Sequence, residues 1–246
     1  MRKAGKVIRE NRDHLHRIEH KGAVDLVTEI DRMAEKLIVT MIRNAFPSHQ
    51  IVAEEGGLEK KESDYIWYVD PLDGTTNYAH GYPHYSVSIA LQHREEIVRG
   101  FVLDPIRDEL FSAAEGRGAF LNGKKIRTSA AATLEECLLA TGFPYELDRR
   151  PHALSLVGRV LGRVQGVRRD GSAALNLAYT AAGRLDGYWE TTLKPWDCAA
   201  GFLLVTEAGG VVSDLGGGDF DIRKPGLVAG NPRIHPKLVQ AIGPQC

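Results

Sequence analysis

The hydrophobic pattern of the chain changes near residue 136, and this change limits the folds that it can adopt. Before that point, short strand-like runs are separated by tight turns; at Asn122-Gly123, both residue types tolerate the positive φ angles of a two-residue hairpin. After that point, strand-like and helix-like segments alternate, which favours a mixed or parallel sheet with helices on its faces. We therefore expect an α+β subdomain over residues 1–136 and an α/β subdomain over residues 137–246, with one shared core.

The period of the apolar residues predicts the individual elements. In the first half we expect helices over residues 1–20 and 28–46 and strands over residues 51–54, 65–70, 86–92 and 97–103. In the second half we expect strands over residues 137–143, 185–190, 211–214 and 227–230 and helices over residues 151–163, 171–183, 196–209 and after Pro236.

The charge balance and the cysteines exclude some classes of protein. The chain has 31 Lys and Arg against 32 Asp and Glu, and it lacks the long basic run that non-specific binding to nucleic acid or a membrane requires. The 3 cysteines are far apart and suit neither a disulfide framework nor a thiolate zinc site. The first residues lack the apolar stretch of a signal peptide, so we expect a cytoplasmic protein with no nucleic-acid or membrane partner.

The segment 67–77, WYVDPLDGTTN, carries the clearest chemical signal. An apolar strand ends at Asp70, Pro71 fixes the backbone, and Asp73 comes before a helical turn that Gly74 opens. Two carboxylates therefore lie on one loop at the end of a strand. The same residues are also typical of a plain turn in which Asp only caps a helix.

Other acidic residues are expected to meet these two. Glu54 and Glu55 end the preceding strand, and Asp197 begins a later helix. Carboxylates that are brought together repel each other and are costly to desolvate, so a convergent cluster implies bound cations. Because only oxygen ligands are offered, Mg²⁺ is favoured over zinc, and Mn²⁺ is also possible. The amides of Gly74 and Thr75 would add an anion pocket, and this combination suits a phosphate.

Several motifs in a fixed order make the chain resemble a known family. They are Glu54-Glu55, DPLDGTTN at residues 70–77, Trp196-Asp197 followed by Ala-Ala-Gly at 199–201, and EAGG at 207–210, with further matches at 21–28 and 171–174. The chain resembles the inositol monophosphatases, of the lithium-sensitive, magnesium-dependent phosphatase superfamily, over about residues 4–235. The resemblance implies a layered αβαβα sandwich, as in the inositol monophosphatases and fructose-1,6-bisphosphatases. It also implies hydrolysis of myo-inositol 1-phosphate or a related sugar phosphate.

The resemblance further implies two to three Mg²⁺ ions and a set of catalytic residues. One ion would be held by Glu54, Asp70 and the Leu72 carbonyl, a second by Asp70, Asp73 and Asp197, and a third, weaker one by Glu54, with Lys21 close by. Together such ions can hold both the attacking water and the leaving oxygen. Thr75, supported by Asp31, would orient the water and help to deprotonate it, with Glu54 also near.

Substrate contacts are implied from both halves of the chain. The residues are Asp73, Gly74, Thr75, Ser172, Ala173, Glu190 and Asp197, with Glu190 and the Ser172-Ala173 backbone on the sugar side. Asp170, Ser172 in place of Thr, and Pro195 depart from the animal pattern, and Pro195 is more typical of the bacterial branch. These departures concern substrate preference and leave the metal ligands unchanged. A homodimer and inhibition by lithium are also implied.

Simpler roles stay open for some of these residues. Asp31 follows Thr28 by three residues and can form a capping box that only starts the helix, and Asp197 can cap its helix likewise. Glu190 alone would be read as a solvated residue at a strand end. Residues 118–124 have the spacing of a phosphate loop, but Lys125 stands where Ser or Thr is required, so we predict a hairpin there.

Two alternative functions accompany the main hypothesis. The first is fructose-1,6-bisphosphatase or NADP phosphatase activity on the same fold. The second, of a different class, is a protein-binding regulatory role in transcription, as is found for some bacterial relatives of the family. Because every acidic residue of the metal site is present, a purely non-enzymatic role is disfavoured, but a second role beside catalysis stays open.

Overall fold

The structure is a computed structural model of the 246-residue chain, and it describes residues 1–12, 18–20, 26–58 and 61–243. The predicted roles of Lys21 fall outside these residues. Among the described residues, no helix is long and apolar enough to cross a membrane.

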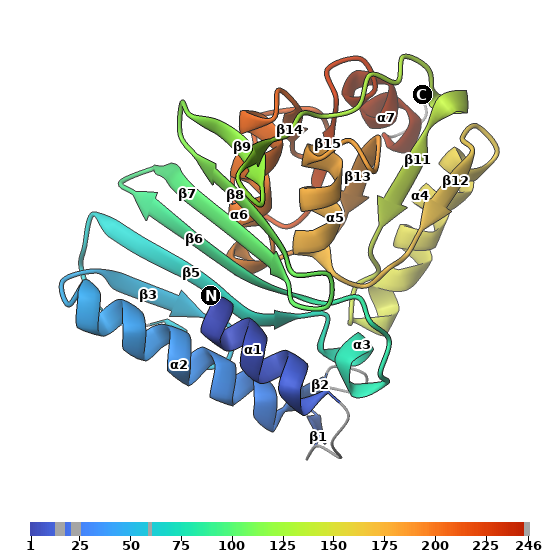
Figure 1. The fold of residues 1–246 in the computed structure, drawn as a ribbon. Helices are drawn as coiled ribbons and strands as arrows, with labels where there is room; N and C mark the ends of the chain where they lie inside the picture. The colour runs from blue at the N-terminus through green and yellow to red at the C-terminus, as the bar shows by residue number, and fades with distance from the viewer. Residues whose placement is uncertain (13–17, 21–25, 59–60, 244–246) are drawn as a thin grey trace.

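Helices and sheets alternate in five layers (Figure 1). Helices α1 (Arg2–Asn11) and α2 (Glu29–Ala45) cover one face of a large sheet. Helices α5 (Ala173–Ala181) and α6 (Pro195–Glu207) lie between this sheet and a smaller one, whose far face is covered by α4 (Arg150–Leu161) and α7 (His235–Ile242). The short helix α3 (Thr75–Ala79) follows strand β5 of the large sheet. The expected αβαβα arrangement is confirmed.

The large sheet has eight strands in the order β10-β9-β8-β7-β6-β5-β3-β4. Their bounds are β3 (Gln50–Ala53), β4 (Gly57–Leu58), β5 (Tyr65–Asp73), β6 (Ser86–His93), β7 (Glu96–Asp104), β8 (Glu109–Ala114), β9 (Gly118–Leu121) and β10 (Lys124–Lys125). Strands β3 and β5 are parallel and the other neighbours are antiparallel. Because β3 and β5 run in the same direction, their carboxyl ends meet at one edge of the sheet.

The smaller sheet has five strands in the order β12-β11-β13-β15-β14. Their bounds are β11 (Leu138–Thr141), β12 (Gly166–Arg168), β13 (Gly187–Glu190), β14 (Val211–Ser213) and β15 (Leu227–Gly230). Strand β11 pairs in parallel with β12 and β13, while β15 is antiparallel to β13 and β14. The predicted mixed sheet with helices on its faces is therefore confirmed. The division into subdomains at residue 136 stays a prediction.

Small residues allow the layer between the sheets to pack closely. Gly100 on β7 lies against the backbone of α6, where an added Cβ would be 2.7 Å from the carbonyl oxygen of Ala200. Gly201 on α6 lies against the Leu177 side chain of α5 in the same way. Helix α6 is apolar on most sides because sheets and α5 surround it, and its start at Trp196-Asp197 is thereby fixed relative to both sheets.

Most of the predicted elements are confirmed, including α2, the β6–β7 hairpin and the hairpin at Asn122-Gly123, whose φ angles are 47° and 79°. One expectation is wrong: a single helix does not extend over the first twenty residues. Helix α1 ends at Asn11, and β1 (Ile18–His20) pairs instead with β2 (Leu26–Thr28) in an antiparallel ladder. The charged helical pattern does not detect this short pairing, because the partner strand is what holds residues 18–20 extended.

Candidate active site

One cleft of about 780 Å³ collects almost all the predicted site residues. It is lined by Glu54, Asp70, Leu72, Asp73, Gly74, Thr75, Ser172, Ala173, Glu190 and Asp197. Asp31 lies behind the cleft wall, where it contacts Thr75. Residues from both sheets and from the starts of α5 and α6 thus meet in one place, as the sequence predicts. The chemical role of each residue remains a prediction.

The parallel pairing of β3 and β5 brings the first two acids together. Ala53 is in register with Val69, and the Glu54 amide donates a hydrogen bond to the Val69 carbonyl at 3.1 Å. Glu54 and Asp70 therefore follow this register pair on two adjacent strands, where β3 ends and the irregular part of β5 begins. Burial raises the pKa of Asp70 well above its usual range, and the charge of Glu54 is the next largest cause. Two like charges in a buried place are unfavourable unless a cation lies between them.

An irregularity in β5 positions the third acid. The register of β5 with β6 shifts between Asp70 and Asp73, around Pro71, which cannot donate a ladder hydrogen bond. Gly74 follows with φ of +104°, and an added Cβ there would lie 3.1 Å from the His84 carbonyl oxygen. Only glycine suits this position, so the motif turns sharply into α3. Asp70 and Asp73 thus both line the cleft in spite of their odd spacing.

Asp73 also anchors the start of α5. Its carboxylate accepts hydrogen bonds from the amides of Ala173 and Ala174, at 3.2 and 2.8 Å, and from the hydroxyl groups of Ser172 and Ser86. Burial raises the pKa of Asp73, and these four donors oppose the rise because they favour the ionised form. Asp73 is therefore a structural link between β5 and α5, a role that the sequence does not reveal.

Thr75 and Asp31 form a direct pair. Thr75 Oγ1 lies 2.7 Å from Asp31 Oδ1 and 3.0 Å from the Leu72 carbonyl oxygen. The other oxygen, Asp31 Oδ2, accepts the Thr28 amide at 2.9 Å, so the predicted capping box is confirmed. The capping role and the contact with Thr75 coexist, because each uses a different oxygen of the same buried carboxylate.

Asp197 completes the acidic group from the start of α6. Its Oδ2 accepts a hydrogen bond from the Lys194 amide at 2.7 Å, so its side chain caps the start of its own helix. Burial raises the pKa of Asp197 well above its usual range, the Lys194 amide opposes this rise, and the charges of Asp73 and Glu54 reinforce it. The charges of these acids thus act on one another across the cleft.

The donor set fits a hard cation. Four carboxylates and a backbone carbonyl offer only oxygen, which is the ligand type that Mg²⁺ and Mn²⁺ share. Within the described part of the chain, however, no three acidic, histidine or cysteine side chains already converge as the ligands of one ion would. Asp73 and Asp197 are turned towards the backbone amides that they cap. Side-chain rotation would therefore accompany metal binding.

Glu190 lies at the end of β13, on the opposite wall. The Tyr188 hydroxyl donates a hydrogen bond to its carboxylate, which packs directly against the α-carbon of Gly142. Desolvation raises the pKa of Glu190 to about 7, while the hydrogen bond from Tyr188 and the charge of Arg169 oppose the rise. Gly142 is a position that the sequence does not single out, because only the fold shows that a side chain there would displace Glu190.

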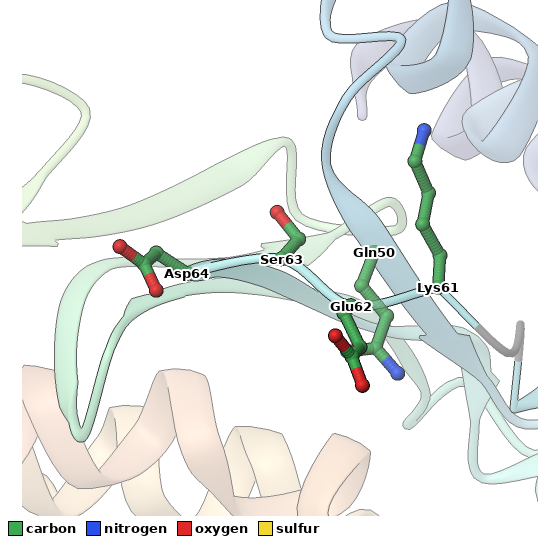
Figure 2. A pocket seen from close by; sticks show the side chains of 5 residues that line it. All are labelled: Gln50, Lys61, Glu62, Ser63 and Asp64. Carbon is green, nitrogen blue, oxygen red and sulfur yellow. The ribbon is translucent and has the colours of Figure 1, made fainter.

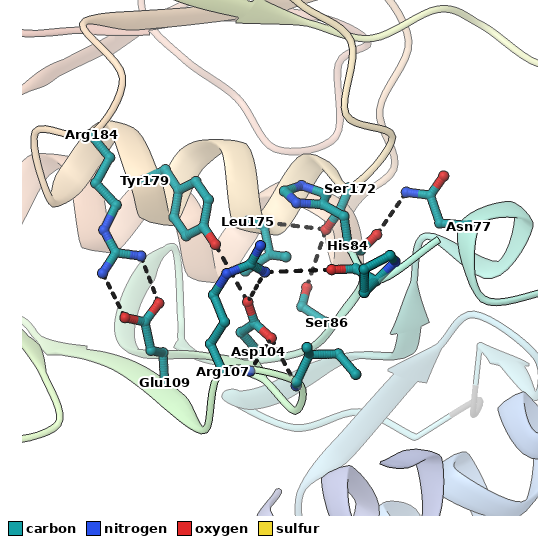
Figure 3. Close-up of polar contacts among 12 residues, drawn as sticks. Asn77, His84, Ser86, Asp104, Arg107, Glu109, Ser172, Leu175, Tyr179 and Arg184 are labelled. Carbon is teal, nitrogen blue, oxygen red and sulfur yellow. Dashed lines mark hydrogen bonds and ion pairs between the residues drawn. The ribbon is translucent and has the colours of Figure 1, made fainter. Parts of the chain in front are cut away.

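Asn77 is a second residue whose role the sequence misses. Its amide nitrogen donates to the carbonyl of His84 at 2.6 Å and to the carbonyl of Asp170 at 2.7 Å. Figure 3 shows Asn77 beside His84, close to Ser172 at the start of α5. The residue thereby ties the loop after α3 to the loop that precedes Gly171 and Ser172. This last residue of the DPLDGTTN motif holds the two loops of the cleft together.

Towards the other end of α5, an ion pair and a hydrogen bond attach this helix and the loop after it to the large sheet (Figure 3). Arg184, just beyond α5, holds Glu109 through two contacts of 2.6 Å, which lower the pKa of Glu109. The Tyr179 hydroxyl donates to the buried Asp104 at 3.4 Å, and Arg107 pairs with Asp104 at 2.9 Å. These contacts fix the helix that presents Ser172 and Ala173 to the cleft.

A second hollow, of about 890 Å³, lies elsewhere on the surface, beside β3. Figure 2 shows its lining, in which Gln50 lies beside residues 61–64. Among the described residues, it has no site residue in common with the acidic cleft. The hollow is open, and both acidic and basic side chains line it, so its lining does not indicate a particular ligand or reaction.

The comparisons with known proteins agree with this geometry. The model of the inositol monophosphatase family matches residues 1–244. The chain belongs to the inositol monophosphatase family. The family assignment that the motifs implied is therefore confirmed over nearly the whole chain.

Individual relatives carry two kinds of name. A protein of Pseudomonas aeruginosa named "Nus factor SuhB" is 45% identical over 251 residues, which cover 99% of this chain and 93% of that protein. The crystal structure of the extragenic suppressor protein suhB from Bartonella henselae is 43% identical, with a TM-score of 0.96 and coverage of 99% of this chain and 95% of that one. An IMPase structure from Thermotoga maritima is 40% identical, with a TM-score of 0.92 and coverage of 98% and 93%. Relatives at similar identity thus carry the names Nus factor SuhB, extragenic suppressor protein suhB and IMPase.

Proposed function

We propose that this member of the family is a Mg²⁺-dependent phosphomonoesterase that hydrolyses myo-inositol 1-phosphate or a closely related sugar phosphate. The observation that carries the proposal is the meeting of Glu54, Asp70, Asp73 and Asp197 in one cleft with the Thr75–Asp31 pair. Without bound metal, these four carboxylates repel a phosphate, although Arg149, Arg169, Lys194 and Arg223 also line the cleft. With Mg²⁺ bound, the electrostatic potential at these carboxylates becomes positive, and a phosphate is attracted.

Three residues, Glu54, Asp70 and Leu72 through its carbonyl, would hold a first Mg²⁺. Asp70, Asp73 and Asp197 would hold a second, and Glu54 a third; Mn²⁺ suits the same oxygens. Bound ions would supply Lewis acidity to the phosphate oxygens and lower the pKa of a water molecule. Helix α3 has only five residues, so the Gly74 and Thr75 amides add a smaller share of the attraction.

The Thr75–Asp31 pair would move a proton during the attack. Thr75 has one hydroxyl proton, and the shorter of its two contacts directs this proton to Asp31 Oδ1. A lone pair of Thr75 Oγ1 then faces the cleft and can accept a proton from the attacking water. Asp31 is buried and held by Thr28, so the direction of the hydroxyl is set before the substrate arrives.

The alcohol part of the substrate would lie towards Glu190 and the start of α5. An ionised Glu190 accepts hydrogen bonds from hydroxyl groups, while Ser172 and Ala173 bound the opposite side. Because Ala173 already donates to Asp73, its contact with the substrate requires the rotation of Asp73 that metal binding also requires.

A substrate panel tests the proposal. Phosphate release from myo-inositol 1-phosphate, fructose 1,6-bisphosphate and NADP is measured with saturating Mg²⁺ and with a chelator. We expect the highest kcat/KM for myo-inositol 1-phosphate and no release with the chelator. A higher kcat/KM for either of the other two substrates would assign the activity to one of the alternatives.

A second candidate function is a protein-binding role in transcription, favoured by the name "Nus factor SuhB" of relatives such as that of Pseudomonas aeruginosa. Asp70→Asn removes a proposed metal ligand but keeps an oxygen for the hydrogen bond from Leu72. If this variant captures the same partners as the wild type from a bacterial lysate, binding does not depend on catalysis. If neither captures a stable partner, the role is excluded for this chain. The predicted homodimer and the predicted absence of nucleic-acid binding stay predictions.

A further inference from the structure

Asp73 has two roles that compete for one carboxylate. The side chain caps α5 through hydrogen bonds from Ser172, Ala173 and Ala174, and it is also a proposed ligand of the second Mg²⁺. These donors occupy both of its oxygens, so a turn of the carboxylate towards a cation weakens the cap. The start of α5 would then be held less firmly in the same state that binds the substrate. A connection that uses no metal ligand would keep this end of the helix in place.

Asn77 provides such a connection. Its side-chain nitrogen donates one hydrogen bond to the His84 carbonyl at 2.6 Å and another to the carbonyl of Asp170 at 2.7 Å, which lies 93 residues further along the chain (Figure 3). A side-chain amide has two donor hydrogens, so both are used here, and only the nitrogen can face two carbonyl oxygens. Asp170 in turn lies two residues before Ser172, the N-cap of α5.

The backbone around the Asn77 side chain is closely packed. Gly74 and Gly171 both have positive φ angles, of +104° and +86°. A Cβ added at Gly74 would lie 3.2 Å from the Gly171 carbonyl oxygen, and one added at Gly171 would lie 3.0 Å from the Asn77 side-chain nitrogen. The turn that leads into α3 thus contacts the loop that leads into α5, and Asn77 bonds this loop where the two meet. The distance between the starts of α3 and α5 therefore depends on these contacts.

We infer that Asn77 is a positioning residue that holds the start of α5 in place relative to Thr75 while Asp73 binds a cation. The inference rests on the proposed function and adds a connection that metal binding does not disturb. Asn77 lies on the same short helix as Thr75, and both of its hydrogen bonds go to backbone carbonyls of residues that are not proposed metal ligands. The Thr75 hydroxyl and the polyol contacts at the start of α5 thus keep their relative positions when the Asp73 cap is released.

Hydrogen exchange in the first turn of α5 tests this without any substrate. The Asn176 amide donates to the Ser172 carbonyl at 3.1 Å, so its exchange rate reports whether this turn is formed. With saturating Mg²⁺, we expect Asn77→Ala to increase this rate by about 10-fold, the effect of one or two lost hydrogen bonds. With a chelator, the Asp73 cap still holds the turn, and the increase should be clearly smaller. An equal increase in both conditions, or none in either, would overturn the inference.

The matched control is Asn231→Ala. Asn231 also donates two hydrogen bonds through its side-chain nitrogen, to the Ser129 hydroxyl and the Ala131 carbonyl, both at 3.1 Å, and it lies outside the cleft lining. We expect this variant to lower the melting temperature, as Asn77→Ala does, but to leave the Mg²⁺ dependence of the Asn176 exchange rate as in the wild type. The same Mg²⁺-dependent change in the control would indicate general destabilisation and would overturn the inference.

Steady-state kinetics give a second readout. The alcohol part of myo-inositol 1-phosphate has hydroxyl groups that can contact the start of α5, whereas 4-nitrophenyl phosphate has none. For Asn77→Ala, we expect the kcat/KM ratio of the first substrate to the second to fall by about 10- to 100-fold, as when a substrate is misplaced by about 1 Å. The Kd of Mg²⁺, measured by calorimetry, should stay close to the wild type. An unchanged ratio, or a loss of Mg²⁺ affinity that accounts for the whole effect, would overturn the inference. If the wild type hydrolyses neither substrate, the proposed function fails separately, and the hydrogen-exchange comparison still decides the inference.

Discussion

Thr75 Oγ1 lies 2.7 Å from Asp31 Oδ1, although 44 residues separate the two in the chain. The second oxygen of Asp31 caps the helix on which it stands, so one carboxylate both starts α2 and holds the Thr75 hydroxyl. The start of α2 and the orientation of the Thr75 hydroxyl therefore depend on the same carboxylate. A substitution at either end of this chain of contacts should separate the structural role from the catalytic one.

Removal of the Thr75 hydroxyl should abolish proton transfer and leave binding nearly intact. For Thr75→Val we expect kcat to fall by about 10²- to 10⁴-fold, the usual contribution of a positioned acid–base group, with KM close to the wild type. Thr75→Ser keeps the hydroxyl and is the matched control, for which we expect most of kcat to be retained. Steady-state phosphate release measures both. Equal kcat values for the Val and Ser variants would contradict the role of the hydroxyl.

The two functions of Asp31 can be distinguished at Thr28. Thr28→Val removes the hydroxyl that caps Ile30 and that also donates to Asp31 Oδ2, but it keeps the backbone amide that donates to the same oxygen. We expect it to lower the free energy of unfolding by about 0.5–2 kcal/mol with little change in kcat. Asp31→Asn should lower both quantities, because one amide group cannot replace both acceptor oxygens. Urea unfolding measures the free energy of unfolding, and steady-state kinetics measure kcat. If Thr28→Val were as stable as the wild type, the proposed contribution of the Thr28 cap to stability would be wrong.

Without metal, the acidic cleft should make the fold less stable as the pH rises. The folded state raises the pKa of Asp70 well above its ordinary value of 3.8, so the folded state holds a proton that the unfolded state has released. Stability therefore falls as the pH rises from that ordinary value towards the folded one. In a chelator, the melting temperature of Asp70→Asn should fall less than that of the wild type between mildly acidic and mildly alkaline pH. Parallel curves for the two proteins would contradict the raised pKa.

The ionisation of Glu190 should produce a step in the pH dependence of kcat/KM. Its pKa is raised to about 7, and only its ionised form accepts hydroxyl hydrogen bonds, so kcat/KM for a polyol phosphate should rise as the pH passes through this value. Glu190→Gln should lack this step, which separates it from the titration of the substrate. Tyr188→Phe removes a hydrogen bond that favours the ionised form and should move the step to higher pH. A shift to lower pH would contradict the assigned contact.

Local patterns in the sequence predict much of the fold and of the candidate site. The helix after Thr28, the Asn122-Gly123 hairpin and the turn at Gly74 each depend on neighbouring residues, and the structure confirms all three. The meeting of Glu54 and Asp70 is predictable because successive strand ends can share one sheet edge.

Other features depend on contacts between distant segments and leave no local signal. Asp73 caps α5 across about 100 residues of sequence, and Gly142, just after β11, makes room for Glu190. The β1–β2 pairing, which gives residues 18–20 of the predicted first helix an extended conformation, also depends on such a contact.

The dependence of myo-inositol 1-phosphate hydrolysis on Mg²⁺, in the wild type and in Asp70→Asn, tests the central claim most directly. Asp70 would bridge two ions, and the Asn variant retains the hydrogen bond from Leu72, so the fold should be preserved in the variant while turnover is lost. The prediction is phosphate release that rises with Mg²⁺ to saturation in the wild type and stays at background in Asp70→Asn. Near wild-type turnover by the variant at saturating Mg²⁺, or release by the wild type that is unaffected by a chelator, would contradict it.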